Sequence, residues 1–266
     1  MRVAVAQVCS TDDVERNLVA AGAMIAEAAQ RGATFVALPE AFAFLRREGD
    51  AIPHARALGS NARAAIANWA ATHNVWLLGG SIPEPVEGSS QLYNTSVLVD
   101  PSGQVVAEYR KIHLFDVDLA GGTDRDRESD TYAAGRDVIV APGPDGGVGL
   151  SICYDLRFPE LYRHQVDQGA RWLCVPSAFT RETGKDHWEV LLRARAIESQ
   201  CYVIAPAQCG QHSPERASHG RSLIIDPWGL VLAQGGDEPA LVIADCPPAA
   251  IDRARTAVPS LRNRRL

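Results

Sequence analysis

Residues 147–178 read GVGLSICYDLRFPELYRHQVDQGARWLCVPSA, and this stretch indicates the fold class of the chain. The apolar run GVGLSIC predicts a buried strand. Pro159 suits the first turn of a helix that continues to about Gln168 and ends at Gly169. A second apolar run, WLCVPSA, then predicts another strand. A strand, a helix and a strand in this order predict an α/β protein.

The same alternation continues toward the N-terminus. RVAVAQV (residues 2–8) predicts a buried strand, and Asp12 or Asp13 caps a helix that ends at Gly32. TFVALP predicts a second strand, and a helix over about residues 60–73 leads to a third strand, VWLLGGS. Each predicted helix in this half of the chain is therefore followed by a predicted strand.

Hairpins are expected as well, because pairs of apolar runs flank short turn sequences. LYNTSVLVD and QVVAEYRK flank residues 100–103, and SLIIDPWG and LVLAQG meet at residues 226–229. Further strands are VIVA, YVIAPAQ and ALVIADC, and a long helix is expected over residues 186–200. Hairpins argue against a purely parallel sheet. We expect one α/β domain of the α+β type over residues 1–266, with ten or more strands and with helices covering the sheets.

The composition excludes several classes of protein. Of 266 residues, 46% are hydrophobic and 22% are charged, which is typical of a globular chain and excludes a disordered or fibrous one. The formal net charge of −6 argues against a nucleic acid or an anionic membrane as partner. No apolar run approaches the ~20 residues that span a bilayer, and the N-terminus does not resemble a signal peptide. We therefore expect a soluble, cytoplasmic protein.

Cysteine and lysine are used sparingly. Six cysteines in an intracellular chain of this length are too few for a disulfide scaffold, and most should be small buried hydrophobes. Of the 26 basic residues, Lys111 and Lys185 are lysines and the rest are arginines. A lysine in such an arginine-rich chain indicates a place where a compact charge is needed.

One acid, one amine and one thiol end three of the predicted strands. Glu40 ends FVALPE, Lys111 ends VVAEYRK and Cys153 ends VGLSIC. Open α/β folds place their sites beyond the carboxyl ends of strands, so these side chains can meet. Each residue alone has an ordinary structural explanation. Glu40 could be an acid at a helix N-terminus, Lys111 a solvated residue at a strand end, and Cys153 a cysteine buried in the core. Their coincidence favours a catalytic site.

These three groups suit amide hydrolysis by a cysteine nucleophile. A cysteine attacks as the thiolate, and an ordinary thiol pKa of about 8.5 leaves little thiolate at neutral pH. The Glu40 carboxylate can accept the thiol proton, and the Lys111 ammonium can stabilise both the thiolate and the oxyanion of a tetrahedral intermediate. Tyr154, at a turn that opens into a helix, offers its backbone N–H to the same oxyanion. Neither histidine nor a metal is needed.

Long motifs surround all three residues. They are ALPEAF around Glu40, YRKIHLFDVD around Lys111 and GLSICYDLRFPELYR around Cys153, joined by VPSAFTRETGKDHWEVLLRARAIESQCYVIAPAQCG. These motifs resemble those of the nitrilase (carbon–nitrogen hydrolase) superfamily, which has a Glu–Lys–Cys triad in this chain order. The resemblance implies that Glu40 is the general base, Lys111 the oxyanion and thiolate partner, and Cys153 the nucleophile. It also implies a four-layer α-β-β-α sandwich, no cofactor or metal, and a homodimer or larger homo-oligomer.

The resemblance further implies a small-molecule amide as substrate. LLRARAIESQCYVIA (residues 191–205) and the RAS-G pattern at residues 216–220 are most similar to Nit-type amidases. This similarity implies hydrolysis of N-(4-oxoglutarate)-L-cysteinylglycine to 2-oxoglutarate and cysteinylglycine through a thioester on Cys153. The nearest alternative is an omega-amidase that acts on 2-oxoglutaramate or 2-oxosuccinamate, because it shares the lysine and cysteine motifs.

Further site residues follow from the resemblance. Glu128, in the polar stretch of residues 116–135 that shows no periodicity, matches a second family glutamate that positions the catalytic lysine and the substrate. A loop of this length is usually functional. Arg157 carries a guanidinium that suits the planar α-keto carboxylate of the substrate. Phe179 and Thr183 match positions that line the acyl pocket. For these last three residues, a structural ion pair or packing is the alternative.

Other chemistries have weaker support in the sequence. GLSIC partly matches the serine hydrolase motif G-x-S-x-G, but it lacks the last glycine, which the sharp turn at the nucleophile needs. A Cys–His hydrolase would use His113 or His187, and His113 is better explained as a structural hydrogen bonder beside the site. Cys209, His212 and His219 have metal-like spacing without a compact fourth ligand. A non-catalytic binding protein with this sandwich has no need for three desolvated polar groups.

Overall fold

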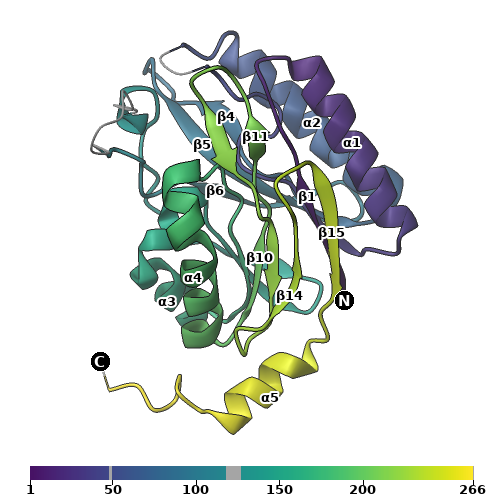
Figure 1. The fold of residues 1–266 in the computed structure, drawn as a ribbon, viewed down its shortest axis with the longest axis vertical. Helices are drawn as coiled ribbons and strands as arrows, with labels where there is room; N and C mark the ends of the chain where they lie inside the picture. The colour runs from purple at the N-terminus through teal and green to yellow at the C-terminus, as the bar shows by residue number, and fades with distance from the viewer. Residues whose placement is uncertain (48–49, 118–126, 266) are drawn as a thin grey trace.

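The computed structural model describes residues 1–47, 50–117 and 127–265 (Figure 1). Two β-sheets face each other in the middle of the molecule, and helices cover the outer side of each sheet. The layers follow the order α-β-β-α, so the predicted sandwich is confirmed. The middle of the polar stretch expected to be a functional loop, residues 118–126, lies outside the described residues.

The first sheet has seven strands and packs against two helices. In β1 every second side chain points the same way, so Val3 and Val5 face the second sheet. Ala4 and Ala6 face the helices. Asp13 caps the first helix by accepting a hydrogen bond from a backbone N–H, as predicted. The elements are β1 (Arg2–Gln7), β2 (Phe35–Ala37), β3 (Trp76–Leu78), β4 (Ile82–Pro85), β5 (Leu92–Val99), β6 (Val105–Arg110), β15 (Ala240–Asp245), α1 (Val14–Gln30) and α2 (Ala55–His73).

The second sheet has six strands, and α3 and α4 pack on its outer side. Pro159 is the first residue of α3, and Gly169 follows that helix with a φ of +93°, as their positions in the sequence predict. The elements are β7 (Val140–Gly143), β8 (Gly146–Leu150), β9 (Ala170–Cys174), β10 (Tyr202–Ala205), β13 (Leu223–Ile225), β14 (Val231–Gln234), α3 (Pro159–Asp167) and α4 (Arg181–Ser199).

Both sheets mix parallel and antiparallel pairs, as the predicted hairpins require. In the first sheet, β1, β2 and β3 run parallel, while β15 and β5 join them antiparallel. In the second sheet, β8, β9 and β10 run parallel and are flanked by antiparallel β7 and β13. A further hairpin of β11 (Cys209–Gln211) and β12 (Ala217–His219) lies apart from both sheets.

Two helices begin earlier than the sequence pattern predicts. Helix α4 starts at Arg181 instead of residue 186, because the Thr180 hydroxyl accepts a hydrogen bond from the Thr183 N–H and so caps the helix there. Helix α2 starts at Ala55 instead of residue 60. Strands β4, β11 and β12 and helix α5 (Ala249–Ala257) were not predicted at all.

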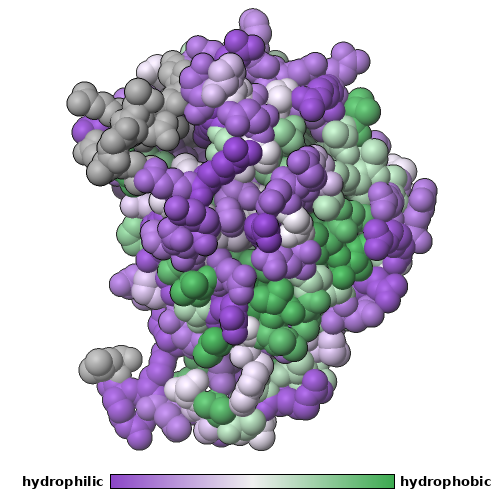
Figure 2. Space-filling view, viewed as in Figure 1, coloured by the Kyte–Doolittle hydropathy of each residue, from purple (hydrophilic) through white to green (hydrophobic). Residues whose placement is uncertain are grey.

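Two clusters of buried apolar side chains hold the layers together. One fills the space between the sheets and under α3 and α4, where Trp172 and Tyr202 stack with ring centroids 4.7 Å apart. The other lies between the first sheet and its two helices. Each large apolar side chain buried in this way stabilises the fold by about 1.5–3 kcal/mol. On the outside, Figure 2 shows a mostly hydrophilic face with a hydrophobic area where β14 and β15 lie. No helix in the described ranges has the length and apolar character to cross a bilayer.

Candidate active site

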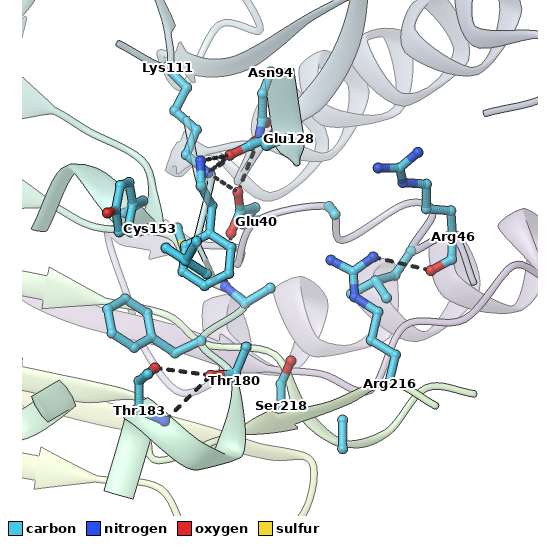
Figure 3. Close-up of a pocket in the computed structure, with 18 of the residues that line it drawn as sticks. Glu40, Arg46, Asn94, Lys111, Glu128, Cys153, Thr180, Thr183, Arg216 and Ser218 are labelled. Carbon is cyan, nitrogen blue, oxygen red and sulfur yellow. Dashed lines mark hydrogen bonds and ion pairs between the residues drawn. The ribbon is translucent and has the colours of Figure 1, made fainter. Parts of the chain in front are cut away.

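A cavity of about 300 Å³ opens where strands of both sheets end (Figure 3). Glu40, Lys111 and Cys153 all line it. Glu40 follows β2 and Lys111 follows β6 in the first sheet, whereas Cys153 follows β8 in the second. The structure therefore brings together three side chains that are far apart in the sequence, and it does so by placing the two sheets face to face.

The Glu40 carboxylate is buried and accepts several hydrogen bonds. Its Oε1 accepts hydrogen bonds from Lys111 Nζ at 3.1 Å and from Asn94 Nδ2 at 2.9 Å. Its Oε2 accepts a hydrogen bond from the Ala178 N–H at 2.9 Å. The next residue, Ala41, has a φ of +53°, so the chain turns sharply just after the acid. These contacts fix the orientation of the carboxylate at the cavity wall.

Lys111 lies between two carboxylates and is 2% exposed. Its Nζ is 3.0 and 2.8 Å from the two carboxylate oxygens of Glu128, in addition to its contact with Glu40. Glu128 belongs to the short 3-10 helix η1 (Glu128–Asp130), and its Oε2 also accepts a hydrogen bond from the Phe115 N–H at 2.7 Å. Glu128 thus contacts the lysine that the resemblance assigned to it.

Cys153 begins the 3-10 helix η2 (Cys153–Arg157) in a left-handed backbone conformation, with a φ of +50°. This region is costly for a residue with a Cβ and is often found at functional turns. The sharp turn at Cys153 therefore forms without the glycine that the serine hydrolase motif places after its nucleophile. The backbone N–H of Cys153 donates a hydrogen bond to the Pro176 carbonyl at 2.9 Å. The Tyr154 N–H lies in the first turn of η2, where N–H groups have no acceptor within the helix.

The charges in the cavity shift the pKa values of all three groups. Burial raises the pKa of Glu40, but the Lys111 charge and hydrogen bonds from Cys153, Lys111 and Asn94 outweigh burial and lower it. Burial lowers the pKa of Lys111, but the Glu128 and Glu40 charges raise it well above its ordinary value. Burial and the Glu40 charge raise the pKa of Cys153 well above that of an ordinary thiol. The resting site thus holds a carboxylate, an ammonium and a protonated thiol.

Asp155 anchors the turn that carries Cys153. It is fully buried and accepts hydrogen bonds from the Tyr109 hydroxyl at 2.7 Å and from the Ile152 N–H at 2.9 Å. The backbone N–H and the ring Nδ1 of His113 lie 3.0 and 2.7 Å from its Oδ1. The His113 ring stacks on Phe158 with centroids 3.7 Å apart. The prediction that His113 is a structural hydrogen bonder beside the site is confirmed.

Arg157, Phe179 and Thr183 also line the cavity. The Arg157 guanidinium carbon lies 5.4 Å from the centroid of the Phe179 ring and 5.8 Å from that of Tyr154. Its Nη1 is 3.2 Å from Nδ1 of His187. The Phe179 ring packs against Trp188 in the core below the cavity. Thr183 lies in the first turn of α4. These residues therefore form one end of the cavity.

Several residues that line the cavity were missed in the sequence. They are Asn94, Tyr132, Arg46, Arg216 and Ser218. Asn94 carried the clearest signal, because it interrupts the apolar strand LYNTSVLV with a polar side chain. The other four lie in short or irregular segments whose spatial position the pattern does not reveal. Ser151, considered as a serine nucleophile, is buried outside the cavity lining, where it bonds to Tyr162 and to the Cys174 carbonyl.

Metal ligation by Cys209, His212 and His219 has no support in the structure. Within the described ranges, no cluster of three or more histidine, cysteine or acidic side chains is arranged to hold a metal ion. Cys209 and His219 are paired across the β11–β12 hairpin, and His212 lies in the turn between these strands.

Comparison with known proteins identifies relatives over the whole chain. A model of the carbon-nitrogen hydrolase family matches residues 2–256. A protein of Synechocystis sp. named deaminated glutathione amidase is 46% identical over 97% of this chain and 96% of its own length. The crystal structure of the Caenorhabditis elegans NitFhit protein has a TM-score of 0.90 and 39% identity, covering 99% of this chain and 65% of that one. A mutant amidase from Nesterenkonia sp. AN1 has a TM-score of 0.81 and 27% identity over 100% and 94% of the two chains, and it carries the acetamide moiety of fluoroacetamide covalently on its active-site cysteine.

Proposed function

Because this chain belongs to the carbon-nitrogen hydrolase family, within the nitrilase superfamily, we propose that it hydrolyses the amide bond of deaminated glutathione, N-(4-oxoglutarate)-L-cysteinylglycine. The family and the amidases among its relatives identify a thiol-dependent hydrolase of carbon–nitrogen bonds. The observation that carries the proposal is the meeting of Glu40, Lys111 and Cys153 at one cavity. The products are 2-oxoglutarate and cysteinylglycine.

In the first half of the reaction, Sγ of Cys153 attacks the amide carbon while its proton passes to Glu40. The two groups share a hydrogen bond in the resting site, so the proton has a direct route. Since the thiol is protonated at rest, the base acts during the attack and not before it. The amide oxygen gains negative charge, which Lys111 Nζ and the Tyr154 N–H stabilise.

In the second half, Glu40 returns that proton to the nitrogen of the leaving amine. The carbon–nitrogen bond breaks, cysteinylglycine departs, and the 2-oxoglutaryl group remains on Cys153 as a thioester. Water then attacks the thioester while Glu40 accepts its proton, and the proton restores the thiol as 2-oxoglutarate leaves. Covalent catalysis in this way replaces one difficult step by two easier ones.

The acyl group is proposed to bind at the end of the cavity formed by Arg157, Phe179 and Thr183. The Arg157 guanidinium suits the α-keto carboxylate because it can donate two parallel hydrogen bonds to a planar anion. The Phe179 ring offers an apolar wall to the methylene groups of the acyl chain. Glu128 holds Lys111 in place while the oxyanion forms.

The decisive experiment compares kcat/KM for deaminated glutathione and 2-oxoglutaramate, with an aliphatic nitrile and an N-carbamoyl amino acid as controls. We expect the highest value for deaminated glutathione and none for Cys153→Ala, whose fold circular dichroism and gel filtration should show to be intact. Rapid quenching followed by mass spectrometry should find the acyl group on Cys153 in the wild type. A higher kcat/KM for 2-oxoglutaramate would identify an omega-amidase instead, and activity in Cys153→Ala would refute the nucleophile.

Assembly into a homo-oligomer in the cytoplasm is part of the same proposal. Helix α4 and the turn between β13 and β14 leave large apolar side chains in solvent, with Ile197 50%, Trp228 62% and Leu230 60% exposed. Exposed apolar side chains gathered in this way are typical of a subunit interface. Analytical ultracentrifugation should find at least a dimer, and Trp228→Glu should dissociate it. A monomeric wild type would contradict this part of the proposal.

A further inference from the structure

A buried histidine lies just behind the cavity and is not part of the proposed mechanism. His212, in the turn between β11 and β12, is 9% exposed. Its Nδ1 is 2.8 Å from the Ser10 backbone carbonyl oxygen, and its Nε2 is 2.8 Å from Oγ of Ser218. Ser218 lies on β12 and lines the cavity. The histidine therefore connects a cavity side chain to the protein interior.

The partners of His212 determine where its proton lies. A backbone carbonyl can accept a hydrogen bond and cannot donate one, so Nδ1 carries the hydrogen that faces Ser10. Burial, with a smaller contribution from the charges of Arg216 and Arg181, lowers the pKa of His212 to about 4. The ring is thus neutral at physiological pH, and Nε2 holds a lone pair. The Ser218 hydroxyl must donate its proton to that lone pair.

This arrangement makes Ser218 a hydrogen-bond acceptor toward the cavity. A free serine hydroxyl rotates and can either donate or accept. The Ser218 hydroxyl already donates its proton to His212, so it can only accept a hydrogen bond from a ligand, through its oxygen lone pairs. A ligand that donates an N–H fits this oxygen, and a ligand that presents a carbonyl or carboxylate oxygen at the same place does not.

The histidine and its partners are held rigidly. The Ser10 N–H donates to Oε1 of Gln208 at 3.0 Å, and the Ser10 hydroxyl donates to the Phe42 carbonyl at 2.7 Å. Nε2 of Gln208 donates in turn to the Glu40 backbone carbonyl at 3.0 Å. A continuous chain of hydrogen bonds thus links Ser218 to the backbone of the proposed base. Buried networks whose members are satisfied fix one orientation of each side chain.

Ser218 lies away from the reacting groups, on another wall of the cavity. In Figure 3 it lies between Thr180 and Arg216, across the cavity from Lys111 and Glu40. The backbones of Ser218 and Thr180 form an antiparallel bridge, so the serine is fixed beside the first turn of α4. Figure 3 shows Thr183, Thr180, Ser218 and Arg216 in this order along the wall, so Ser218 lies on the side of Thr180 away from Thr183. With the acyl group at Thr183, a donor that meets Ser218 belongs to a part of the substrate beyond the acyl group.

We propose that Ser218, positioned by His212, accepts a hydrogen bond from the peptide N–H of the departing dipeptide and so selects substrates with a peptidyl leaving group. The inference rests on the proposed function, because it takes the acyl group to bind at the Arg157 end. A primary amide such as 2-oxoglutaramate has no N–H beyond the scissile nitrogen and gains nothing from Ser218. The pair thus favours deaminated glutathione over the omega-amidase substrate.

The test uses Ser218→Ala with three substrates. These are deaminated glutathione, its analogue in which an ester oxygen replaces the peptide N–H of cysteinylglycine, and 2-oxoglutaramate. We expect Ser218→Ala to lower kcat/KM for deaminated glutathione about 5- to 10-fold and to leave 2-oxoglutaramate unchanged. The ester analogue should be a poorer substrate than deaminated glutathione for the wild type and an equal one for the variant. Ser96→Ala, a buried serine of β5 outside the cavity lining, is the control and should change none of these values.

His212 variants separate positioning from general structural damage. His212→Gln keeps one donor and one acceptor and should retain the substrate preference, whereas His212→Phe should lose it while keeping activity on 2-oxoglutaramate. An equal loss on all substrates in Ser218→Ala, or the same penalty for the ester analogue in wild type and variant, would overturn the inference. A wild type that turns over 2-oxoglutaramate but not deaminated glutathione would refute the proposed function and the Ser218 contact with it. If deaminated glutathione is hydrolysed and Ser218→Ala changes nothing, the Ser218 contact alone is refuted.

Discussion

The hydroxyl of Tyr109 donates a 2.7 Å hydrogen bond to the buried carboxylate of Asp155. Tyr109 lies on β6, two residues before Lys111, and Asp155 lies in η2, two residues after Cys153. One hydrogen bond thus connects the backbone segment that carries Lys111 to the segment that carries Cys153, across the boundary between the two sheets. We expect the distance between Lys111 and Cys153 to depend on this link.

Asp155→Asn should therefore damage both stability and activity. In the variant, the NH₂ group of the asparagine side chain would face hydrogen-bond donors that the Asp155 carboxylate now accepts from. Some of these buried donors would then have no acceptor. We expect the free energy of unfolding in urea to fall by about 3 kcal/mol. Asp252→Asn, which alters an exposed partner of Arg171, is the control and should be indistinguishable from the wild type. An unchanged denaturation midpoint in Asp155→Asn would show that the network does not hold the turn.

Lys111→Arg should abolish turnover although it keeps the positive charge. Nζ of Lys111 fits between two carboxylates in a space that leaves it 2% exposed, and a planar guanidinium is too large for that space. We expect kcat to fall by ~10³-fold, as when an oxyanion donor is lost. The other lysine provides a matched control, because Lys185 is exposed and Lys185→Arg should be fully active. Near wild-type turnover in Lys111→Arg would refute the role assigned to Lys111.

The pH dependence of kcat/KM should reflect the lowered pKa of Glu40. A base whose pKa is lowered stays ionised as the pH falls through the ordinary carboxyl range, so activity should persist down to about pH 5. The raised pKa of Lys111 keeps that group charged beyond the ordinary lysine pKa of about 10.4, so Lys111 should cause no loss of activity below that pH. Asn94→Ala removes one hydrogen bond that favours the carboxylate and should move the acid limb to higher pH. An acid limb near neutrality in the wild type would contradict the assignment of Glu40 as base.

Arg157→Ala should weaken binding of α-keto-acid amides more than it slows the chemical step. Loss of a charged pair of hydrogen bonds to the keto carboxylate should raise KM about 10- to 100-fold. Simple aliphatic amides lack that carboxylate and should be affected little. Arg31→Ala, at an exposed residue that directly follows α1, is the control for a loss of charge elsewhere. An unchanged KM would exclude Arg157 as the carboxylate partner.

The three catalytic candidates could be found in the sequence because each directly follows an apolar run. The position of a residue at the end of a strand is a local property that the hydrophobic pattern reveals. Which sheet a strand joins is not a local property of the sequence. For example, β1 pairs with β15, which comes from the far end of the chain. The sequence therefore indicated that Glu40, Lys111 and Cys153 meet, but not that they meet across two sheets.

The elements that were missed are short or chemically atypical. Strand β4 contains two prolines and reads as a loop, yet it pairs with β5 at one end of the sheet, where proline is tolerated. Strands β11 and β12 have three residues each and show no alternation of apolar and polar residues. Ser218 and His212 lie in this hairpin, and their pairing depends on Ser10, about two hundred residues earlier. A contact between residues this far apart in the sequence cannot be predicted from the local pattern of apolar and polar residues.

In the proposed mechanism the acid and the amine come from one sheet and the sulfur from the other, so turnover depends on the relative position of the two sheets. A displacement of about an ångström between the layers can cost a hundredfold in rate while both layers remain folded. On heating, catalysis should thus fail at a lower temperature than the loss of ellipticity. A chain that ends before residue 153 carries the acid and the amine without the thiol.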